Sequence, residues 1–234
     1  LAEKELNEAT QPLMIYILTI TNHTPYEVPK NYDVKPLKVS DQLVERMQKG
    51  EEEAMRLLET YQYANNALGE FIMDIKKSPL GDSTLIAATG DHRLRGFTMT
   101  YPNDLPIIHA VPFYLYVPEK IQQQVPYLYD EKRVGSHKDI FPTLYAFSLS
   151  EANYYSLGGH NLLGADKTIR FGYNPEMTLT EKGIYLNAKP EQIYEWAEEL
   201  GINRRSIQNN DKQLGNEYHK LQTLYINGQV KGTH

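Results

Sequence analysis

The amino-acid sequence predicts an α/β fold with a largely parallel sheet that is flanked by helices. Residues 84–89 are almost entirely apolar and do not alternate with polar residues. Such a run is typical of a strand that is covered on both faces in a parallel sheet. Residues 13–20 have the same character, and a long amphipathic helix is expected between the two runs. Strand, helix and strand in this order predict a right-handed βαβ crossover.

The helix between these strands is the clearest element of the first half. Three prolines and little periodicity predict a loop over residues 24–40. A helix is expected to start near Asp41, pause at Gly50 and resume at Glu51, where three consecutive glutamates favour the positive end of the helix dipole. Its apolar stripe has spacings of three and four residues and contains Leu57, Tyr61, Ala64, Leu68, Phe71 and Ile75.

A third strand and a short helix are predicted in the middle of the chain. Residues 111–117 are expected to form the strand, with Pro112 near its start, where a missing N–H is tolerated. Irregular segments precede it and a loop follows it over residues 118–137. Asp139 fits the N-cap of a short helix that continues to Ser148.

The C-terminal part is predicted to begin with a hairpin and to end in helices. Residues 168–173 and 183–186 are expected to pair with each other. Pro190 is interpreted as the start of a helix that Gly201 ends. The apolar face of that helix is expected to contain Ile193, Trp196, Ala197 and Leu200. Residues 210–226 are expected to form a second helix.

Composition restricts the class of protein. The 234 residues, of which 41% are hydrophobic and 23% charged, can bury one sizeable core. We therefore predict one domain over residues 1–188 and a helical extension over residues 189–234. The net charge of −6 and the lack of a basic stripe argue against a nucleic-acid partner. The chain has no cysteine, which excludes disulfides, thiolate metal sites and cysteine nucleophiles. It starts at Leu1 without a methionine, so we expect a fragment of a longer protein.

Asp91 and His92 are the leading candidates for metal ligands. They follow Gly90, which ends the apolar run of residues 84–89. In open parallel sheets, binding and active-site residues lie just beyond the carboxyl ends of the strands. A carboxylate and an imidazole are usual oxygen and nitrogen ligands of a divalent ion. The structural alternative is a turn in which Asp91 caps locally and His92 lies on the surface.

His23, His137 and Arg93 are the candidates for contacts with an anionic substrate. His23 follows the run 13–20 as Asp91 follows its own strand, so parallel neighbouring strands would bring both to one edge; alternatively His23 only shapes a loop. His137 precedes the N-terminus of the helix at Asp139, where anions bind readily, or it makes a structural hydrogen bond. Arg93 either offsets phosphate charge or is an ordinary exposed arginine.

Several segments together carry a resemblance to a known family. They are residues 21–26 (TNHTPY), 63–71, 84–92, 111–113, 136–143 (SHKDIFPT) and 158–163 (GGHNLL). Their order and spacing over residues 13–165 resemble the carboxyl half of the sulfatase-like enzymes of the alkaline phosphatase superfamily. The lipoteichoic acid synthase and phosphoglycerol transferase branch is the most similar. Asn161 departs from this pattern, because the family usually has aspartate there.

The resemblance implies a fold, a cofactor and a set of roles. The family fold is a mixed, largely parallel sheet between helices, and residues 1–188 would be the carboxyl half of its catalytic domain. Asp91 and His92 would bind a divalent metal ion, with manganese preferred and zinc, magnesium or calcium as alternatives. His23, His137 and Arg93 would contact the substrate. The family's nucleophile and first acidic ligand lie in an amino-terminal half that this chain does not contain, so we expect weak metal binding and no turnover from the chain alone.

The resemblance also implies a function and a location. The parent protein would be a metal-dependent transferase or hydrolase of phosphate or sulfate esters, most specifically one that transfers phosphoglycerol from a phospholipid headgroup. A non-catalytic module that binds a headgroup or a protein is the alternative. The parent would be anchored at the extracytoplasmic face of a bacterial membrane, with this part soluble.

Overall fold

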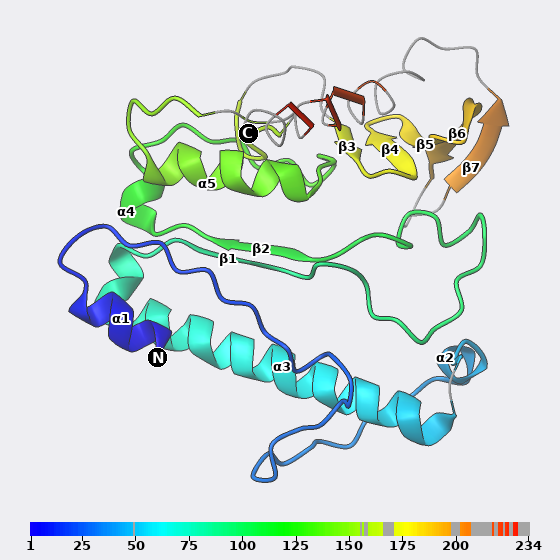
Figure 1. Cartoon of the computed structure of the whole chain (residues 1–234), viewed down its shortest axis with the longest axis horizontal. Coiled ribbons are helices and arrows are strands. Elements are labelled where there is room, and N and C mark those ends of the chain that lie inside the picture. Colours follow the sequence, from blue (N-terminus) through cyan, green and yellow to red (C-terminus); the bar gives the residue numbers. More distant parts are fainter. Residues whose placement is uncertain are drawn as a thin grey trace.

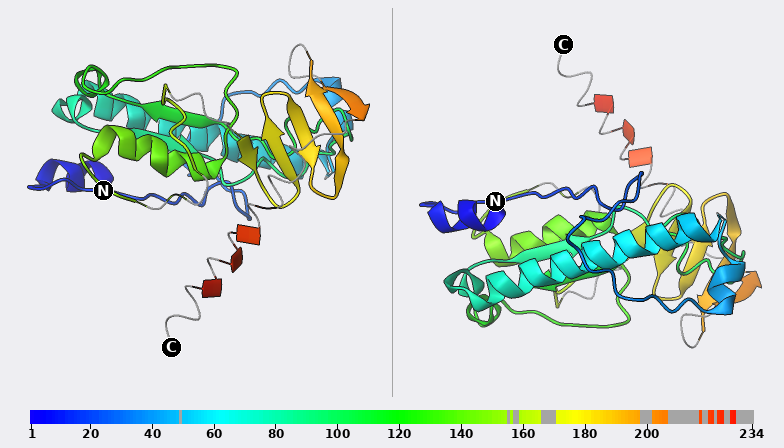
Figure 2. Two further views of the ribbon diagram at one scale, coloured as in Figure 1. Left: turned by 90° about the horizontal axis from the view of Figure 1, so that it is seen from above. Right: turned by 90° about the horizontal axis from the view of Figure 1, so that it is seen from below.

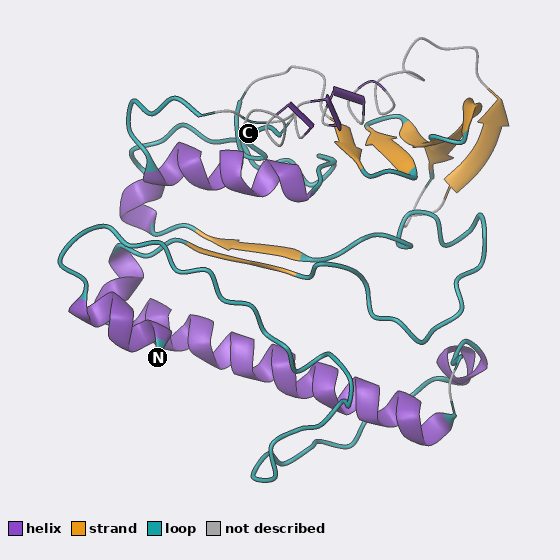
Figure 3. Ribbon diagram, viewed as in Figure 1, coloured by secondary structure: helices purple, strands orange, loops and turns teal. Residues whose placement is uncertain are grey.

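The computed structural model describes residues 1–48, 50–154, 156, 159–165, 171–197 and 202–206, and single residues between 217 and 228. The described elements form layers that are visible in Figure 1. Helix α3 (Glu51–Lys77) lies below a two-stranded sheet, and helix α5 (Ile140–Ser148) lies above it. A second sheet of five strands lies beside α5. Figure 3 shows the helices on opposite faces of the first sheet, so the prediction of flanking helices is confirmed.

Helix α3 begins where the sequence predicts. Gly50 is its N-cap, the three glutamates occupy its first turn, and a 3₁₀ turn, η1 (Pro79–Asp82), follows its end. A short helix, α2 (Asp41–Glu45), precedes it, and α1 (Ala2–Glu8) lies near the N-terminus. Leu57 and Ile75 of the predicted stripe are buried, whereas Tyr61 and Leu68 are exposed. The stripe is therefore covered at its ends and open in the middle.

The first sheet is antiparallel rather than parallel. Strand β1 (Ile86–Thr89) pairs with β2 (Phe113–Tyr116), with Ile86 opposite Tyr116 and Thr89 opposite Phe113. Side chains of β1 alternate between half-buried and exposed, so the apolar run is not covered on both faces. The connection between the strands is irregular and contains no crossover helix. Every strand pair in the described part of the chain is antiparallel.

The prediction of a strand at residues 13–20 is wrong. The segment is unpaired and runs along one side of the molecule in both views of Figure 2. Ile15 is half-buried, and the other apolar side chains are between 50% and 78% exposed, at Leu13, Met14, Tyr16, Ile17, Leu18 and Ile20. A run that is apolar on both faces needs a neighbouring strand and a layer on each side, and the described residues supply neither. The predicted βαβ crossover is therefore absent from the described structure.

The predicted short helix at residues 139–148 is confirmed. Asp139 is the N-cap of α5, and Pro142 and Thr143 are buried in its first turns. A 3₁₀ turn, η2 (His137–Asp139), precedes the helix. The segment 118–137, which was predicted as loop, also contains a short helix, α4 (Glu119–Gln122).

The second sheet is an antiparallel meander of five strands in chain order. The strands are β3 (Phe171–Tyr173), β4 (Met177–Thr180), β5 (Gly183–Leu186), β6 (Lys189–Trp196) and β7 (Ile202–Ser206). The hairpin prediction missed β4, which pairs with both β3 and β5. Strand β4 therefore lies between the two segments that were expected to pair with each other.

The prediction of a helix from Pro190 is wrong, because this segment is strand β6. Ile193 and Tyr194 are fully buried although they point to opposite faces, which fits a strand covered on both sides. Pairing with β5 and β7 and the β-branched and aromatic side chains outweigh the helical spacing. The extension predicted from residue 189 thus begins inside a continuous sheet. Leu200, Gly201 and most of the helix predicted over 210–226 lie outside the described residues.

The loop between β1 and β2 ties the second sheet to the rest of the fold. Leu105 of this loop is buried in one cluster with Met177, Ile184 and Tyr194 of the second sheet. The hydroxyl of Tyr101 also contacts that of Tyr194. No helix within the described ranges has the length and hydrophobicity that crossing a membrane requires.

Candidate functional site

The turn that follows β1 presents Asp91 and His92 to solvent. The His92 N–H donates to Asp91 Oδ1 at 2.9 Å, and the side chain of Asp91 is 86% exposed. The His92 Nδ1 lies 2.7 Å from the carbonyl oxygen of Arg93. Because a carbonyl oxygen only accepts, Nδ1 is the donor, and in the neutral imidazole Nε2 carries the lone pair. That Nε2 lies 3.7 Å from Asp91 Oδ2.

His137 is brought to this turn from a distant part of the chain. Its Nε2 lies 2.7 Å from the carbonyl oxygen of Gly90, which is 47 residues away in sequence. The sequence placed His137 near the site as a substrate contact. The structure places it against the backbone of the residue that precedes Asp91.

Arg93 is directed into its own loop. Its Nε donates to the carbonyl oxygen of Ile108 at 3.1 Å, and its Nη1 donates to that of Leu94 at 2.9 Å. The bond to Ile108 joins two parts of the loop between β1 and β2 that are 15 residues apart. The two bonds leave Nη2 as the guanidinium nitrogen that is not engaged by these carbonyls.

His23 lies in an exposed turn, and its ring is 3.3 Å from the hydroxyl of its neighbour Thr24. The described structure gives it no hydrogen bond to the Gly90–His92 turn. The argument that put His23 and Asp91 at one sheet edge depended on a strand at 13–20, which is not formed. Its role therefore stays a prediction.

A buried carboxylate that the sequence treated only as a helix cap connects the site to the rest of the fold. Asp139 is 2% exposed. Its Oδ2 accepts from the N–H of Ser136 at 2.6 Å and its Oδ1 accepts from the N–H of His160 at 2.7 Å. Thr143 completes the connection by donating to the Asp139 carbonyl and accepting from the N–H of Leu162. The signal for this role was the serine three residues before Asp139, which is a capping-box spacing.

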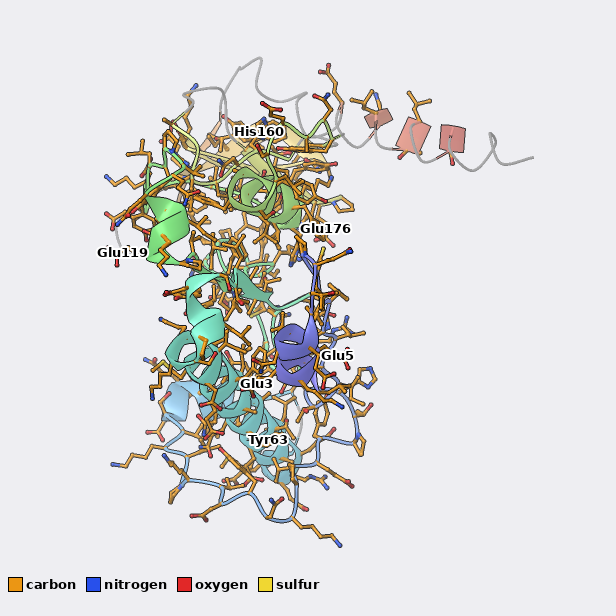
Figure 4. The ribbon with its side chains drawn as sticks, turned by 90° about the vertical axis from the view of Figure 1, so that its left-hand side faces the viewer. Glu3, Glu5, Tyr63, Glu119, His160 and Glu176 are labelled. Atoms are coloured by element: carbon orange, nitrogen blue, oxygen red, sulfur yellow. The ribbon has the colours of Figure 1, made fainter. Side chains whose placement is uncertain are left out.

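His160 lies between the turn before α5 and the second sheet. Its imidazole is one-third exposed and lies 6.1 Å from the ring of Phe171, between centroids. Figure 4 shows His160 at the end of the molecule that carries the second sheet, far from Tyr63 on α3. Asp139 and His160 thus join the turn before α5 to the second sheet.

Comparison with known proteins shows the family to which this chain belongs. The family model described as Sulfatase matches residues 1–147, which is more than half of the chain. The chain belongs to the sulfatase family. An α/β fold of the alkaline phosphatase type follows from this membership, although the described strands show no parallel pair.

Relatives of this sulfatase-family chain include lipoteichoic acid synthases. It is 27% identical over 177 residues to the lipoteichoic acid synthase-like YvgJ of Bacillus subtilis. The aligned region covers 70% of this chain and 27% of that protein. It is 24% identical over 196 residues to a lipoteichoic acid synthase of Staphylococcus saprophyticus. The aligned region covers 79% of this chain and 28% of that protein. The chain thus spans little more than a quarter of the length of these relatives. No solved structure matches it.

The Asp91–His92 pair has the chemistry that a divalent ion needs, and sulfatase-family enzymes generally use such an ion. Metal-binding histidines usually donate their other N–H to a carbonyl or carboxylate, and His92 does so to Arg93. Two ligands about 2.1 Å from one ion in tetrahedral geometry lie about 3.4 Å apart, close to the 3.7 Å between His92 Nε2 and Asp91 Oδ2. Within the described ranges no third histidine, aspartate or glutamate completes a metal-binding group.

Lys138 should make the stability of this sulfatase-family chain depend on pH. Its Nζ lies 3.3 Å from the ring centroid of Tyr173, and burial lowers the pKa of its ammonium from 10.5 to about 8, although the charge of Asp139 opposes this change. Between these values the unfolded chain holds a proton that the folded chain has lost, so the free energy of unfolding rises with pH. We expect Lys138→Met to lack this rise in urea unfolding at pH 7.5 and 9.5. The exposed Lys132→Met is the control, and identical pH profiles for Lys138→Met and wild type would contradict the prediction.

Proposed function

We propose that the chain is the carboxyl part of a metal-dependent enzyme that transfers or hydrolyses phosphate or sulfate esters. Transfer of phosphoglycerol from a phospholipid headgroup is the preferred reaction, because two relatives are named lipoteichoic acid synthase or lipoteichoic acid synthase-like. The observation that carries the proposal is the arrangement of His92. Its Nδ1 donates to a backbone carbonyl, while its Nε2 lies 3.7 Å from the Asp91 carboxylate.

Each candidate residue has a separate task in this proposal. Asp91 and His92 hold the metal ion; manganese or zinc suits a carboxylate with an imidazole better than magnesium or calcium does. Such an ion, when bound, lowers the pKa of the nucleophile and neutralises phosphate charge. His23 donates a hydrogen bond to a phosphate oxygen from its exposed turn. Arg93 offers its Nη2 to the same anion in a charge-assisted hydrogen bond.

The remaining machinery is assigned to the rest of the parent protein. The nucleophile and a further acidic ligand come from an amino-terminal half of the catalytic domain. The short span of this chain relative to its relatives supports this assignment. We further propose that the parent is anchored in a bacterial membrane with this domain on the extracytoplasmic face. No turnover of a chromogenic phosphodiester is expected from the chain alone with added Mn²⁺.

Removing the Asp91 carboxylate should weaken metal binding by the chain. We expect Asp91→Ala to weaken Mn²⁺ binding at least tenfold, because one of two ligands and the only negative charge of the pair are lost. Electron paramagnetic resonance of free Mn²⁺ during titration measures the dissociation constant. Asp130→Ala, which removes an exposed aspartate from another loop, is the matched control. Equal affinities for Asp91→Ala and wild type would refute the metal site.

A further inference from the structure

His137 makes its strongest contact with the backbone of the candidate metal turn. The bond from Nε2 to the Gly90 carbonyl oxygen is 2.7 Å long, within the ordinary range for a hydrogen bond. Gly90 directly precedes Asp91, so this bond fixes the peptide unit from which the two candidate metal ligands extend. The contact joins the turn before α5 to the end of β1.

The direction of this bond decides between two roles for His137. The Gly90 carbonyl accepts, so Nε2 is the donor. A neutral imidazole has a single N–H, and the one on His137 is used by Gly90. In that neutral form the remaining nitrogen, Nδ1, is an acceptor and offers no hydrogen to a phosphate oxygen. The geometry therefore favours a contact to the protein backbone over a contact to an anionic substrate.

The turn that carries His137 is itself held firmly. Asp139, two residues later, accepts from the N–H of Ser136 and from the N–H of His160. Lys138 lies over the ring of Tyr173 in β3. These contacts hold the Ser136–Asp139 turn to the second sheet, and the bond of His137 extends that support to Gly90.

We infer that His137 is a positioning residue for the metal ligands and not a contact to substrate. It acts through the Gly90 carbonyl, which it holds so that Asp91 and His92 project together into solvent. This inference rests on the proposed metal site, and it changes the role that the sequence suggested for His137. Removal of a group that orients metal ligands typically weakens metal binding by about 10–100-fold.

Three variants of His137 separate the inferred role from a general effect on folding. The side chain of His137→Gln carries an N–H near the position of the histidine Nε2, whereas that of His137→Asn carries one near the position of Nδ1. His137→Ala carries neither. We expect Mn²⁺ binding, measured without any phosphate compound, to weaken about tenfold in His137→Ala and His137→Asn and to remain within about threefold of wild type in His137→Gln.

Hydrogen exchange provides a second measurement that needs no metal. In the metal-free chain, amides of residues 89–93 should exchange faster in His137→Ala and His137→Asn than in wild type, and His137→Gln should restore protection. His109→Ala is the matched control, since His109 is partly exposed and bonds to Glu176 at 3.0 Å in another part of the fold.

The two measurements keep this inference distinct from the proposed function. Wild-type affinity together with wild-type exchange in His137→Ala would overturn the positioning role, as would equal losses in His137→Gln and His137→Asn. If the wild-type chain binds no Mn²⁺, the proposed metal site fails. The exchange rates of residues 89–93 would then still decide whether His137 holds the turn.

Discussion

Replacing Asp139 by asparagine should lower the free energy of unfolding by about 3 kcal/mol. The two carboxylate oxygens each accept a hydrogen bond from a different backbone N–H, one from Ser136 and one from His160. An asparagine side chain has almost the same shape but only one accepting oxygen. In either orientation of the amide, its NH₂ group faces a backbone N–H. The site is buried, so no solvent replaces the lost bond.

Urea unfolding followed by circular dichroism measures this loss. Asp130→Asn is the control, because Asp130 is exposed and accepts from the N–H of Lys132 at 3.0 Å. We expect it to change stability by less than about 0.5 kcal/mol. A stability of Asp139→Asn equal to that of the control would mean that the carboxylate does not hold the turn before α5 to the loop at His160.

Alanine at Gly172 should be at least as damaging, at about 3 kcal/mol or more. Gly172 lies in the middle of β3, and a Cβ there would overlap the backbone carbonyl of Gly135. A Cβ at Gly135 would in turn lie 2.6 Å from the side chain of Leu162. Neither backbone can move without separating β3 from the turn that carries Lys138 and Asp139. The second sheet should therefore detach or unfold at lower denaturant concentration.

A helical glycine provides the contrast for this prediction. Gly69 lies in α3, and a Cβ at this position would meet nothing within 4 Å. Gly69→Ala should stabilise the chain by about 0.5–1 kcal/mol, because alanine has the higher helix propensity. Thermal unfolding of both variants measures the difference. A destabilisation by Gly172→Ala that is no larger than 0.5 kcal/mol would show that β3 does not pack as closely on Gly135 as the structure indicates.

The helices were predictable because their signals are local. The three glutamates after Gly50 mark the start of α3, and Asp139 marks the start of α5. Strand β6 was missed because the spacing of its apolar residues also fits a helix. Its pairing with β5 and β7 depends on strands that are adjacent only in the folded sheet, and single-segment patterns carry no such information.

The prediction of strand direction was wrong for a related reason. The run at residues 84–89 was predicted to lie parallel to a strand at residues 13–20, but that segment is unpaired in the described structure. Strand β1 pairs instead with β2, in the antiparallel direction.

The candidate site was predictable only in part. Asp91 and His92 were found because they follow a strand directly. The bond from His137 to Gly90 was not, because it depends on where the Ser136–Asp139 turn docks. The burial of Asp139 was also not readable, since an acidic residue before a helix is ordinarily an exposed cap.

Leu105 has a consequence for how molecules reach Asp91 and His92. This side chain is inserted among Met177, Ile184 and Tyr194, so an outward movement of the loop between β1 and β2 would expose a buried leucine, which costs about 2 kcal/mol or more. Access to Asp91 and His92 does not require that movement, because both side chains are already exposed.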